Sequence, residues 1–444
     1  MEVNGFRIRM ILPVVLISLL ISVGFAAVNL IIPYYLLALK GLLTEPPDIL
    51  ARVETREVAL EFGAMTSAFM LTRTLFALVS GGLSDHFGRK KLIVTGMAIY
   101  VLVSILYVFT ASVEELILLR ALQGVASALV WPVAETLLVD LVPPFYRARA
   151  LSLYVISMQV GHVAGPLVGV AAYMASRMLI HGDVITLLRA PFAIVALFTI
   201  PGLILATTLP ETIQRSETRN SLASAALSFT SVFREVGDRV RRSLAAIYTN
   251  SLINGFTMGI FVSVATLFIM DRITANPIHI GITFAVASLV GMTTAYPMAG
   301  RIDRLDAARK KTVLIAAAFT ARTTWLLIAF SSNILELLAA LILAQVSFNI
   351  LMPLMRTIQV ELVPQNLRGR VFGMQQAFFN AGMIVGPMVG AYLYRAWKDL
   401  VLLGGLLSGD QLVFIMAALL GYVGAAVLAL YYEPVSSPSA PRAP

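Results

Sequence analysis

The sequence contains no cysteine among its 444 residues. It therefore offers no disulfide, no thiol nucleophile and no thiolate ligand for a metal ion. Histidine is also scarce: the four histidines are scattered, without the spacing of metal ligands, and no glycine-rich loop for nucleotide phosphates is present. Charged residues make up 13% of the sequence, about half of the roughly 25% that is usual for soluble proteins. These absences argue against a metalloenzyme, an ATP-driven protein and a soluble globular domain.

Long apolar segments dominate the sequence instead, and the mean hydropathy is +0.86. A helix that crosses a bilayer needs about 20 apolar residues. Twelve segments meet this requirement: 10–39, 58–83, 92–112, 114–142, 149–177, 187–208, 244–270, 277–300, 312–332, 334–363, 371–397 and 408–432. The first is too long for a signal peptide and is interpreted as a retained helix. The sequence thus predicts an all-α membrane protein with twelve transmembrane helices in two pseudo-symmetric six-helix bundles.

A self-match at a constant offset of 221 residues relates the two halves. Asp140–Tyr173 aligns without gaps to Glu361–Tyr394, and eleven of the 34 aligned pairs are identical. The two halves are therefore copies of one unit. Two parallel hydrophobic halves with a site between them are typical of many secondary transporters.

The repeat and the polar centre of the chain predict four segments. An N-terminal bundle covers 1–208, a cytoplasmic linker 209–243, a C-terminal bundle 244–433 and a disordered tail 434–444. Within the linker, apolar residues from Leu222 to Val240 recur at helical spacing, with arginines near the end. This amphipathic helix is either an interfacial linker between the halves or a regulatory lipid-binding helix.

The net charge of +9 is interpreted as an indication of how the chain is oriented in the membrane, and not as a sign of nucleic-acid binding. With the N-terminus inside, 21 of the 33 lysines and arginines fall on the cytoplasmic side and 8 on the outer side. This distribution follows the positive-inside rule. It predicts a multi-pass protein of the cell membrane with both termini in the cytoplasm and no nucleic-acid partner.

Three motifs stand at fixed places in the predicted helices. The first is GGLSDHFGRKK, residues 81–91, between the second and third helices, with a degraded copy at 300–311. Its glycines permit a tight turn, and Asp85 can accept hydrogen bonds from a helix N-terminus or pair with arginine.

The second motif is RALQG, which begins at Arg120 in the fourth helix. An arginine inside a membrane span is costly unless it faces a partner or water; the alternative is an arginine that extends toward the outer surface.

The third motif lies in the fifth helix and is repeated in the eleventh. Glycines four residues apart make a flat face for close helix packing, and the proline bends the helix. The residues concerned are Gly161, Gly165, Pro166 and Gly169, with Gly382, Gly386, Pro387 and Gly390 in the second half.

Together these motifs make the chain similar to the major facilitator superfamily, and the glycine motif of the fifth helix is typical of its twelve-helix drug:proton antiporters. The resemblance covers nearly the whole chain, including the Leu209-Pro210-Glu211-Thr212 exit from the sixth helix. It implies transport by alternating access and a gate on the cytoplasmic side. The expected gating residues are Gly82, Asp85, Gly88, Arg89, Asp140 and Arg147.

Helical phase selects candidates for a central cavity, which the resemblance places along the fourth and tenth helices. Arg120, Ser127, Trp131 and Glu135 share one stripe, and Gln345, Asn349, Met352 and Arg356 share another. Arg73, in the middle of the second helix, is a further candidate. Intramembrane acids are costly, which favours a proton-coupling role for Glu135, with a structural ion pair as the alternative. Asp140 and Glu361 point away from these stripes and are expected in cytoplasmic charge networks with Asp85, Arg147 and Arg368.

These observations predict a secondary active transporter, most simply a proton-coupled exporter of small amphipathic compounds. An organic-anion or sugar permease is the alternative, because Arg73, Arg120 and Arg356 are cationic and the first helix carries no acidic residue. A polytopic membrane enzyme or a non-transporting sensor is the alternative from another class. The expected partners are a small-molecule substrate, the proton and the lipid bilayer, for a monomer with no cofactor and no metal.

Overall fold

The computed structural model describes the chain except residues 1, 4–5, 48–50, 144–145, 180, 213–232, 234, 303–304, 365–366 and 435–444. Within the described residues, twelve helices are long and apolar enough to cross a membrane. The predicted all-α architecture is therefore confirmed. Most of the predicted linker helix and nearly all of the predicted tail lie outside the described residues, and the four-segment division of the chain stays a prediction.

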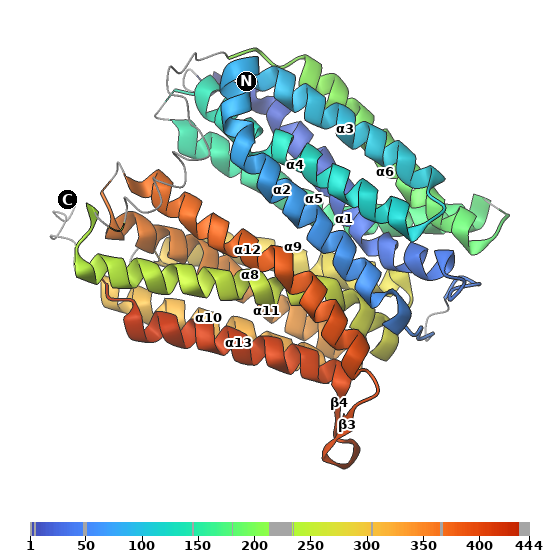
Figure 1. Ribbon diagram of the computed structural model, residues 1–444. Helices are drawn as coiled ribbons and strands as arrows, with labels where there is room; N and C mark the ends of the chain where they lie inside the picture. Colours follow the sequence, from blue (N-terminus) through green and yellow to red (C-terminus); the bar gives the residue numbers. More distant parts are fainter. Residues whose placement is uncertain are drawn as a thin grey trace. The chain divides into compact units, whose positions relative to one another are not determined.

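The helices of the first half are shown in blue to green in Figure 1. They are α1 (Ile8–Leu39), α2 (Ala59–Phe87), α3 (Arg89–Phe109), α4 (Val113–Leu141), α5 (Arg147–Leu179) and α6 (Val184–Thr207), with the 3-10 turn η1 (Arg56–Val58) before α2. In this half α2 packs on α4, α1 packs on α5 and α6, and α3 packs on α4 and α6. Short strands β1 (Glu2–Val3) and β2 (Phe6–Arg7) precede α1.

The helices of the second half are α8 (Asp238–Arg272), α9 (Pro277–Ile302), α10 (Ala307–Phe330), α11 (Ile334–Leu362), α12 (Arg368–Trp397) and α13 (Gly409–Tyr431). Here α10 packs on α11 and α13, and α12 packs on α13. A hairpin of β3 (Val401–Leu402) and β4 (Leu407–Ser408) separates α12 from α13, with the 3-10 turn η4 (Leu403–Gly405) at its tip.

Two compact units make up the chain, and they do not coincide with the two sequence repeats. One unit contains 1–220 together with 265–286, and the other contains 221–264 together with 287–444. The end of α8 thus belongs to the first unit. There the backbone N–H and the hydroxyl of Thr55 each donate to the carboxylate of Asp271 at 2.9 Å.

Each unit has its own apolar core, built from the faces that its helices turn toward one another. In the first unit, residues such as Ile17, Ile93 and Leu137 are buried. In the second unit, residues such as Leu314 and Ile358 are buried. The removal of these side chains from polar surroundings, and the close packing that accompanies it, hold the helices of each unit together.

Polar residues at the helix ends set the boundaries. Ser112 and Glu115 form a capping box at the start of α4, in which each side chain accepts a hydrogen bond from the other's backbone N–H. Asp183, Asp306 and Asn333 cap α6, α10 and α11 through their side-chain oxygens. These caps satisfy N–H groups that have no partner inside their own helix.

The break between α2 and α3 is much shorter than the sequence predicts. The motif at 81–91 was expected to form a loop, but α2 continues to Phe87 and α3 begins at Arg89. Gly88 alone separates the two helices, with φ of 96° and ψ of 145°. Only glycine adopts this conformation without strain, so a single residue is enough to reverse the chain direction.

Candidate functional site

An ion pair joins the first residue of α3 to the end of α4. The guanidinium of Arg89 pairs with the carboxylate of Asp140, and both side chains are largely buried. The same guanidinium lies 3.4 Å from the carbonyl oxygen of Thr136, to which it donates. Arg147, which follows in α5, donates from Nε to the carbonyl oxygen of Val139 at 3.1 Å. Asp140 was expected in a network with Asp85 and Arg147; the structure gives Arg89 as its ion partner, while Arg147 binds the backbone beside it.

The segment that leaves α6 reaches the same end of the unit. The backbone N–H of Lys90 donates to Glu211 Oε1 at 3.3 Å, and the hydroxyl of Thr212 donates to Asp140 Oδ2 at 3.5 Å. A carboxylate at this position satisfies an N-terminal N–H of α3 and meets the positive end of its dipole. A Cβ atom on Gly88 would lie 2.6 Å from the Glu211 carboxylate, so a larger residue there would displace this carboxylate from its position.

The second unit repeats this ion pair with other residues. Lys310, near the start of α10, pairs with Glu361, near the end of α11. Glu361 was expected in a network around Arg368, and the structure gives Lys310 as its ion partner. The neighbouring Tyr432 lies beside Lys311, whose ammonium is 6.0 Å from the ring centre. Burial and, to a lesser extent, the Glu361 carboxylate raise the pKa of Tyr432 to about 12, so its hydroxyl stays neutral at physiological pH.

Arg120 is buried in the first unit, with 4% of its surface exposed. It donates from Nη2 to Asn29 Oδ1 of α1 at 2.6 Å and from Nη1 to Gln123 Oε1 at 3.0 Å. Its guanidinium also lies 5.7 Å from the ring centre of Phe25. Tyr107 of α3 donates to the same Gln123 oxygen at 3.4 Å. Neutral amide oxygens therefore hold this cation between α1 and α4.

Glu135 has a different cationic neighbour from the one its helical stripe suggests. It lies within electrostatic range of Arg73 in α2 and of Tyr154 in α5. Its side chain is exposed, whereas Tyr154 is buried and donates to the carbonyl oxygen of Trp131 at 3.3 Å. Arg73 of α2 and Tyr154 of α5 therefore lie within electrostatic range of this carboxylate of α4, and Arg120 belongs to a separate cluster.

In the second unit, the two amides of the α11 stripe hold α11 to α9. Gln345 Nε2 donates to Ser288 Oγ at 3.1 Å, and Asn349 Nδ2 donates to the carbonyl oxygen of Gly291 at 2.7 Å. Arg356 is exposed, with its guanidinium 5.9 Å from the ring centre of Phe372. Of the four residues of this stripe, Arg356 is thus the one whose side chain is exposed and available to a ligand.

The glycine motif of α5 packs against α1. A Cβ atom on Gly161 would collide with Ser22, and one on Gly165 would lie 2.5 Å from the Cβ of Ala26 and 2.7 Å from the carbonyl oxygen of Val23. These contacts bring the two backbones into direct proximity. Gly169 lies further along the same face, where a Cβ atom would be 3.3 Å from the carbonyl oxygen of Ala27.

The repeated glycine motif of α12 packs against α8 in the same way. Cβ atoms on Gly382 and Gly386 would collide with the backbone of Phe256, and one on Gly390 would lie 2.8 Å from Ile260 Cα. Pro387 packs against Gly259 of α8, as a Cβ atom there would lie 2.6 Å from the proline ring. In each half, the motif therefore serves close helix packing.

Two residues of the expected gate have no role in the described contacts. Gly82 is exposed, and a Cβ atom on it would meet open space. Asp85 lies on α2, and its side chain is outside the described part of the structure. Their gating roles therefore stay predictions.

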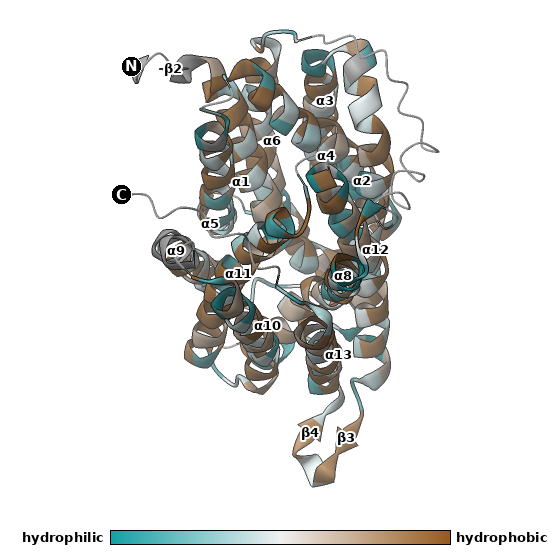
Figure 2. Cartoon of the chain, turned by 90° about the vertical axis from the view of Figure 1, so that its left-hand side faces the viewer, coloured by the Kyte–Doolittle hydropathy of each residue, from teal (hydrophilic) through white to brown (hydrophobic). Residues whose placement is uncertain are grey.

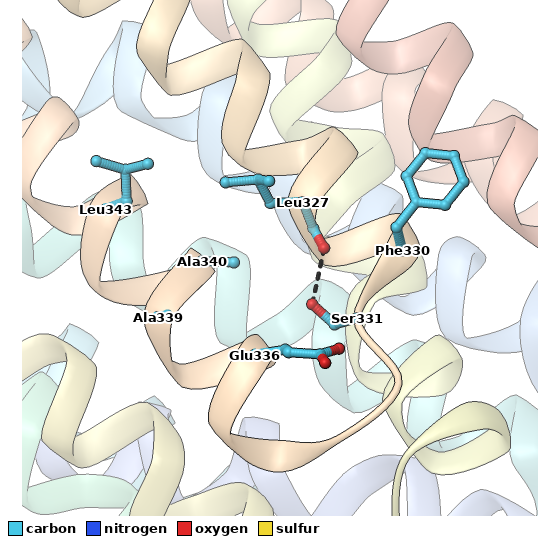
Figure 3. Close-up of a pocket in the computed structure, with 7 residues that line it drawn as sticks. All are labelled: Leu327, Phe330, Ser331, Glu336, Ala339, Ala340 and Leu343. Atoms are coloured by element: carbon cyan, nitrogen blue, oxygen red, sulfur yellow. Dashed lines mark hydrogen bonds between the residues drawn. The ribbon is translucent and has the colours of Figure 1, made fainter.

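A hollow of about 400 Å³ opens between the ends of α10 and α11 (Figure 3). Its lining is mostly apolar and consists of Leu327, Phe330, Ser331, Glu336, Ala339, Ala340 and Leu343. The Ser331 hydroxyl donates to the carbonyl oxygen of Leu327 at 2.7 Å, and Glu336 Oε2 accepts from the backbone N–H of Ser332 at 2.8 Å. No predicted site residue lines the hollow, so it is separate from the charged clusters. Among the described residues, no group of three or more acidic or histidine side chains could hold a metal ion.

Sequence reasoning missed the interhelical partners of the charged residues. Asn29 is the amide in an otherwise apolar part of the first helix, which was a usable signal because an isolated polar residue in a membrane span needs a partner. Gln123 stands inside the RALQG motif, one helical turn after Arg120. Lys310 lies 221 residues after Arg89, the offset that also separates Asp140 from Glu361.

Comparison with known proteins gives a consistent family assignment. A family model described as Major Facilitator Superfamily matches residues 14–249 and 247–444. The chain is 22% identical over 376 residues to Multidrug resistance protein 1 of Bacillus subtilis, which covers 84% of this chain and 87% of that protein. It is 25% identical over 370 residues to the multi-drug resistance efflux pump PmrA of Streptococcus pneumoniae, with 82% and 85% covered.

Solved structures share the fold at low sequence identity. The nucleoside transporter NupG superposes with a TM-score of 0.72 at 14% identity, over 96% of this chain and 100% of that chain. A bacterial homolog of the human lysosomal transporter Spinster gives a TM-score of 0.71 at 16% identity, over 97% and 98% of the two chains. At these identities the likeness shows the fold alone.

Proposed function

The chain belongs to the major facilitator superfamily, and on this premise we propose that it exports small amphipathic compounds in exchange for protons. It is a multi-pass membrane transporter, and the proposal concerns its substrate and its coupling ion. Similarity to proteins named as multidrug resistance proteins and efflux pumps along most of the chain supports export.

The observation that carries the proposal is the surrounding of Glu135. This exposed carboxylate lies in a membrane span, within electrostatic range of Arg73, which stands in the middle of α2. Loss of water disfavours its charged form, and the neighbouring guanidinium favours it. Its proton affinity therefore changes when water or a substrate enters or leaves its surroundings. A carboxylate of this kind can bind a proton from one side of the membrane and release it on the other.

The ion pairs at the ends of α4 and α11 support alternating access. Arg89–Asp140 and Lys310–Glu361 each tie the start of one helix to the end of the next within a unit. We propose that each holds the predicted cytoplasmic end of its unit in one arrangement, while Asp85 forms the contact that opens and closes the transporter. A ligand shifts such an equilibrium by its difference in affinity for the two arrangements.

The proposed orientation puts both termini and these ion pairs in the cytoplasm of a monomeric transporter in the cell membrane. The excess of arginine and lysine on this side supports it. A reporter enzyme that is active only outside the cell should stay inactive when fused after Pro444, and activity of this fusion would contradict the orientation.

Transport in vesicles tests the proposed function directly. The purified protein is reconstituted into proteoliposomes, and a fluorescent lipophilic cation is followed with and without a pH gradient. We expect an acidic interior to drive accumulation of the cation, and an added protonophore to abolish it. Transport that ignores the gradient would contradict proton coupling. Lack of transport for every amphipathic compound would contradict the proposed substrate class.

Export of organic anions is the second candidate, because exposed cations are present in both halves. Arg356 is exposed in α11, and Arg73 is partly exposed in α2. A carboxylate or sulfonate substrate would pair with such guanidinium groups. The same vesicles, given a fluorescent organic anion in place of the cation, distinguish the two candidates. Sugars, which carry no charge, form the third arm of the panel.

A further inference from the structure

An apolar hairpin projects from the second unit between α12 and α13. Val401 pairs with Ser408 and Leu402 pairs with Leu407 in its two short antiparallel strands. Gly404 and Gly405 at the tip have φ of 68° and 101°, values that favour glycine. At the base, the backbone N–H of residue 409 donates to the carbonyl oxygen of residue 400 at 2.8 Å. The hairpin is thus a formed structure with its own backbone hydrogen bonds.

Large apolar side chains cover the outside of this hairpin. Val401, Leu403 and Leu406 are 67%, 74% and 81% exposed, and Leu400 and Leu402 are also exposed. The segment 400–408 contains no charged residue. An exposed apolar patch of this size usually marks a surface that binds a partner or a membrane.

The direction of the hairpin relative to its own helices indicates which of these it meets. In two views at right angles, the hairpin runs sideways away from α10 and α13 and does not continue along the helix axes (Figure 1 and Figure 2). The axes of membrane helices cross the bilayer, so a sideways extension at the helix ends runs along the membrane surface. Figure 2 shows most of its strand residues in the brown of apolar side chains.

The surroundings of the hairpin continue this apolar surface. Along α13, which begins directly after the hairpin, Leu419 and Val423 are exposed in the isolated protein, as expected for side chains that face lipid. Trp397, the last residue of α12, is followed by Lys398, Asp399 and then the hairpin. Tryptophan is enriched at the boundary between membrane and water. The apolar hairpin thus begins at the depth of this boundary and adjoins a lipid-facing helix.

The corresponding connection in the first half has a different character. It joins α5, which ends at Leu179, to α6, which begins at Val184, and leaves room only for residues 180–183. Within it, His181 and Asp183 are polar and exposed. The hairpin is therefore an addition to the second copy of the repeat and does not follow from the common helix arrangement.

We propose that residues 400–408 insert their apolar side chains into the interfacial layer of the bilayer beside α13. The partner is the lipid surface itself. The strand pairing reduces the number of backbone groups that would enter this layer without a hydrogen-bond partner, and the leucines and valine leave water. The insertion fixes the depth of the ends of α12 and α13 in one leaflet.

The absence of cysteine makes this proposal directly testable. Leu403→Cys and Leu406→Cys are labelled with an environment-sensitive fluorophore in the otherwise cysteine-free chain and reconstituted in phosphatidylcholine vesicles. His181→Cys, at the corresponding end of the first half, is the matched control. All three variants must show the melting temperature of the parent protein, and labelling both tip positions separately guards against an effect of one substitution.

We expect lipids with a spin label near the headgroup to quench both tip fluorophores at least about twice as strongly as the control, with aqueous iodide showing the opposite order. Equal quenching by iodide at all three positions would place the hairpin in water and overturn the proposal. Energy transfer between labelled copies that increases with protein density, without quenching by the lipid, would assign the hairpin to a second copy of the chain and would also overturn it.

Discussion

Arg89 and Asp140 form an ion pair whose counterpart stands 221 residues further along the chain, where Lys310 pairs with Glu361. The offset is the same as that of the sequence repeat. Both pairs join the first turn of one helix to the last turn of the next. The two halves therefore share this contact and its charges, with arginine as the cation in the first half and lysine in the second.

Loss of one partner should weaken this contact strongly. Asp140→Asn leaves the largely buried guanidinium of Arg89 without its carboxylate, and an uncompensated buried charge costs about 3 kcal/mol or more. We expect a lower melting temperature and impaired transport in proteoliposomes. The exchanged pair Arg89→Asp with Asp140→Arg should recover part of both losses, and full activity of Asp140→Asn alone would remove the contact from the mechanism.

Gly88→Ala should disturb the turn between α2 and α3. The backbone conformation at this position strains any other residue by roughly 2 kcal/mol, and the new Cβ atom would also meet the Glu211 carboxylate. We expect a clear drop in melting temperature. Gly81→Ala is the matched control, because its Cβ atom meets open space within a helix. A variant of Gly88 as stable as that control would show that the contact with Glu211 is dispensable.

Glu135→Gln should uncouple transport from the pH gradient. The amide keeps the shape of the side chain but cannot exchange a proton, so accumulation against the gradient is lost while passive substrate exchange can continue. Glu114→Gln, an exposed acid in the first turn of the same helix, should behave as the parent protein. The measurement is dye transport in vesicles over a range of pH values. Unchanged pH dependence in the Glu135 variant would leave this residue a structural role only.

Arg120 and Asn29 should be energetically coupled. Hydrogen bonds to a charged group contribute about 1.5–3 kcal/mol, and the Arg120 guanidinium connects α4 to α1 through Asn29. A double-mutant cycle with Arg120→Gln and Asn29→Ala should give a coupling of this size in equilibrium unfolding, read from tryptophan fluorescence. Additive effects of the two substitutions would show that the bond does not stabilise the unit.

Acid should selectively weaken the start of α6. Hydrogen bonds from the hydroxyl and backbone N–H of Thr186 hold the pKa of Asp183 below its usual value. A carboxyl group with a lowered folded-state pKa stabilises the fold above its unfolded pKa, about 3.9, and this contribution disappears as the pH falls through the folded pKa. The difference in melting temperature between the parent and Asp183→Ala should therefore shrink below about pH 4. Asp183→Ser, a cap that does not titrate, should show no such change relative to Asp183→Ala.

The sequence predicted the helices well because each one is a long apolar run. The eleventh predicted segment, 371–397, is α12 at Arg368–Trp397. The errors lie at charged ends: Arg89 was assigned to a loop but begins α3, since a single glycine suffices for the reversal. Hydropathy cannot distinguish a charged helix end from a loop, whereas backbone hydrogen bonds can.

The sequence predicted which residues belong to the candidate site, but it did not predict which of them interact with one another. Helical phase grouped Arg120 with Glu135, because both lie on one stripe of α4. In the structure, Arg120 donates hydrogen bonds to Asn29 and Gln123, and Glu135 lies within electrostatic range of Arg73 instead. Asn29 and Arg73 belong to other helices than α4, and their choice as partners depends on packing distances that one sequence does not contain.

The glycine contacts between α1 and α5 and between α8 and α12 determine where each unit can deform. At Gly165 and at Gly386, the neighbouring helix comes close enough that its backbone would touch an added Cβ atom. No side chain lies there that could change rotamer and absorb a displacement. Each of these two helix pairs is therefore stiff and moves as a rigid body. The deformation that a transport cycle needs must come from the helix ends, where single hydrogen bonds and ion pairs can be exchanged one at a time.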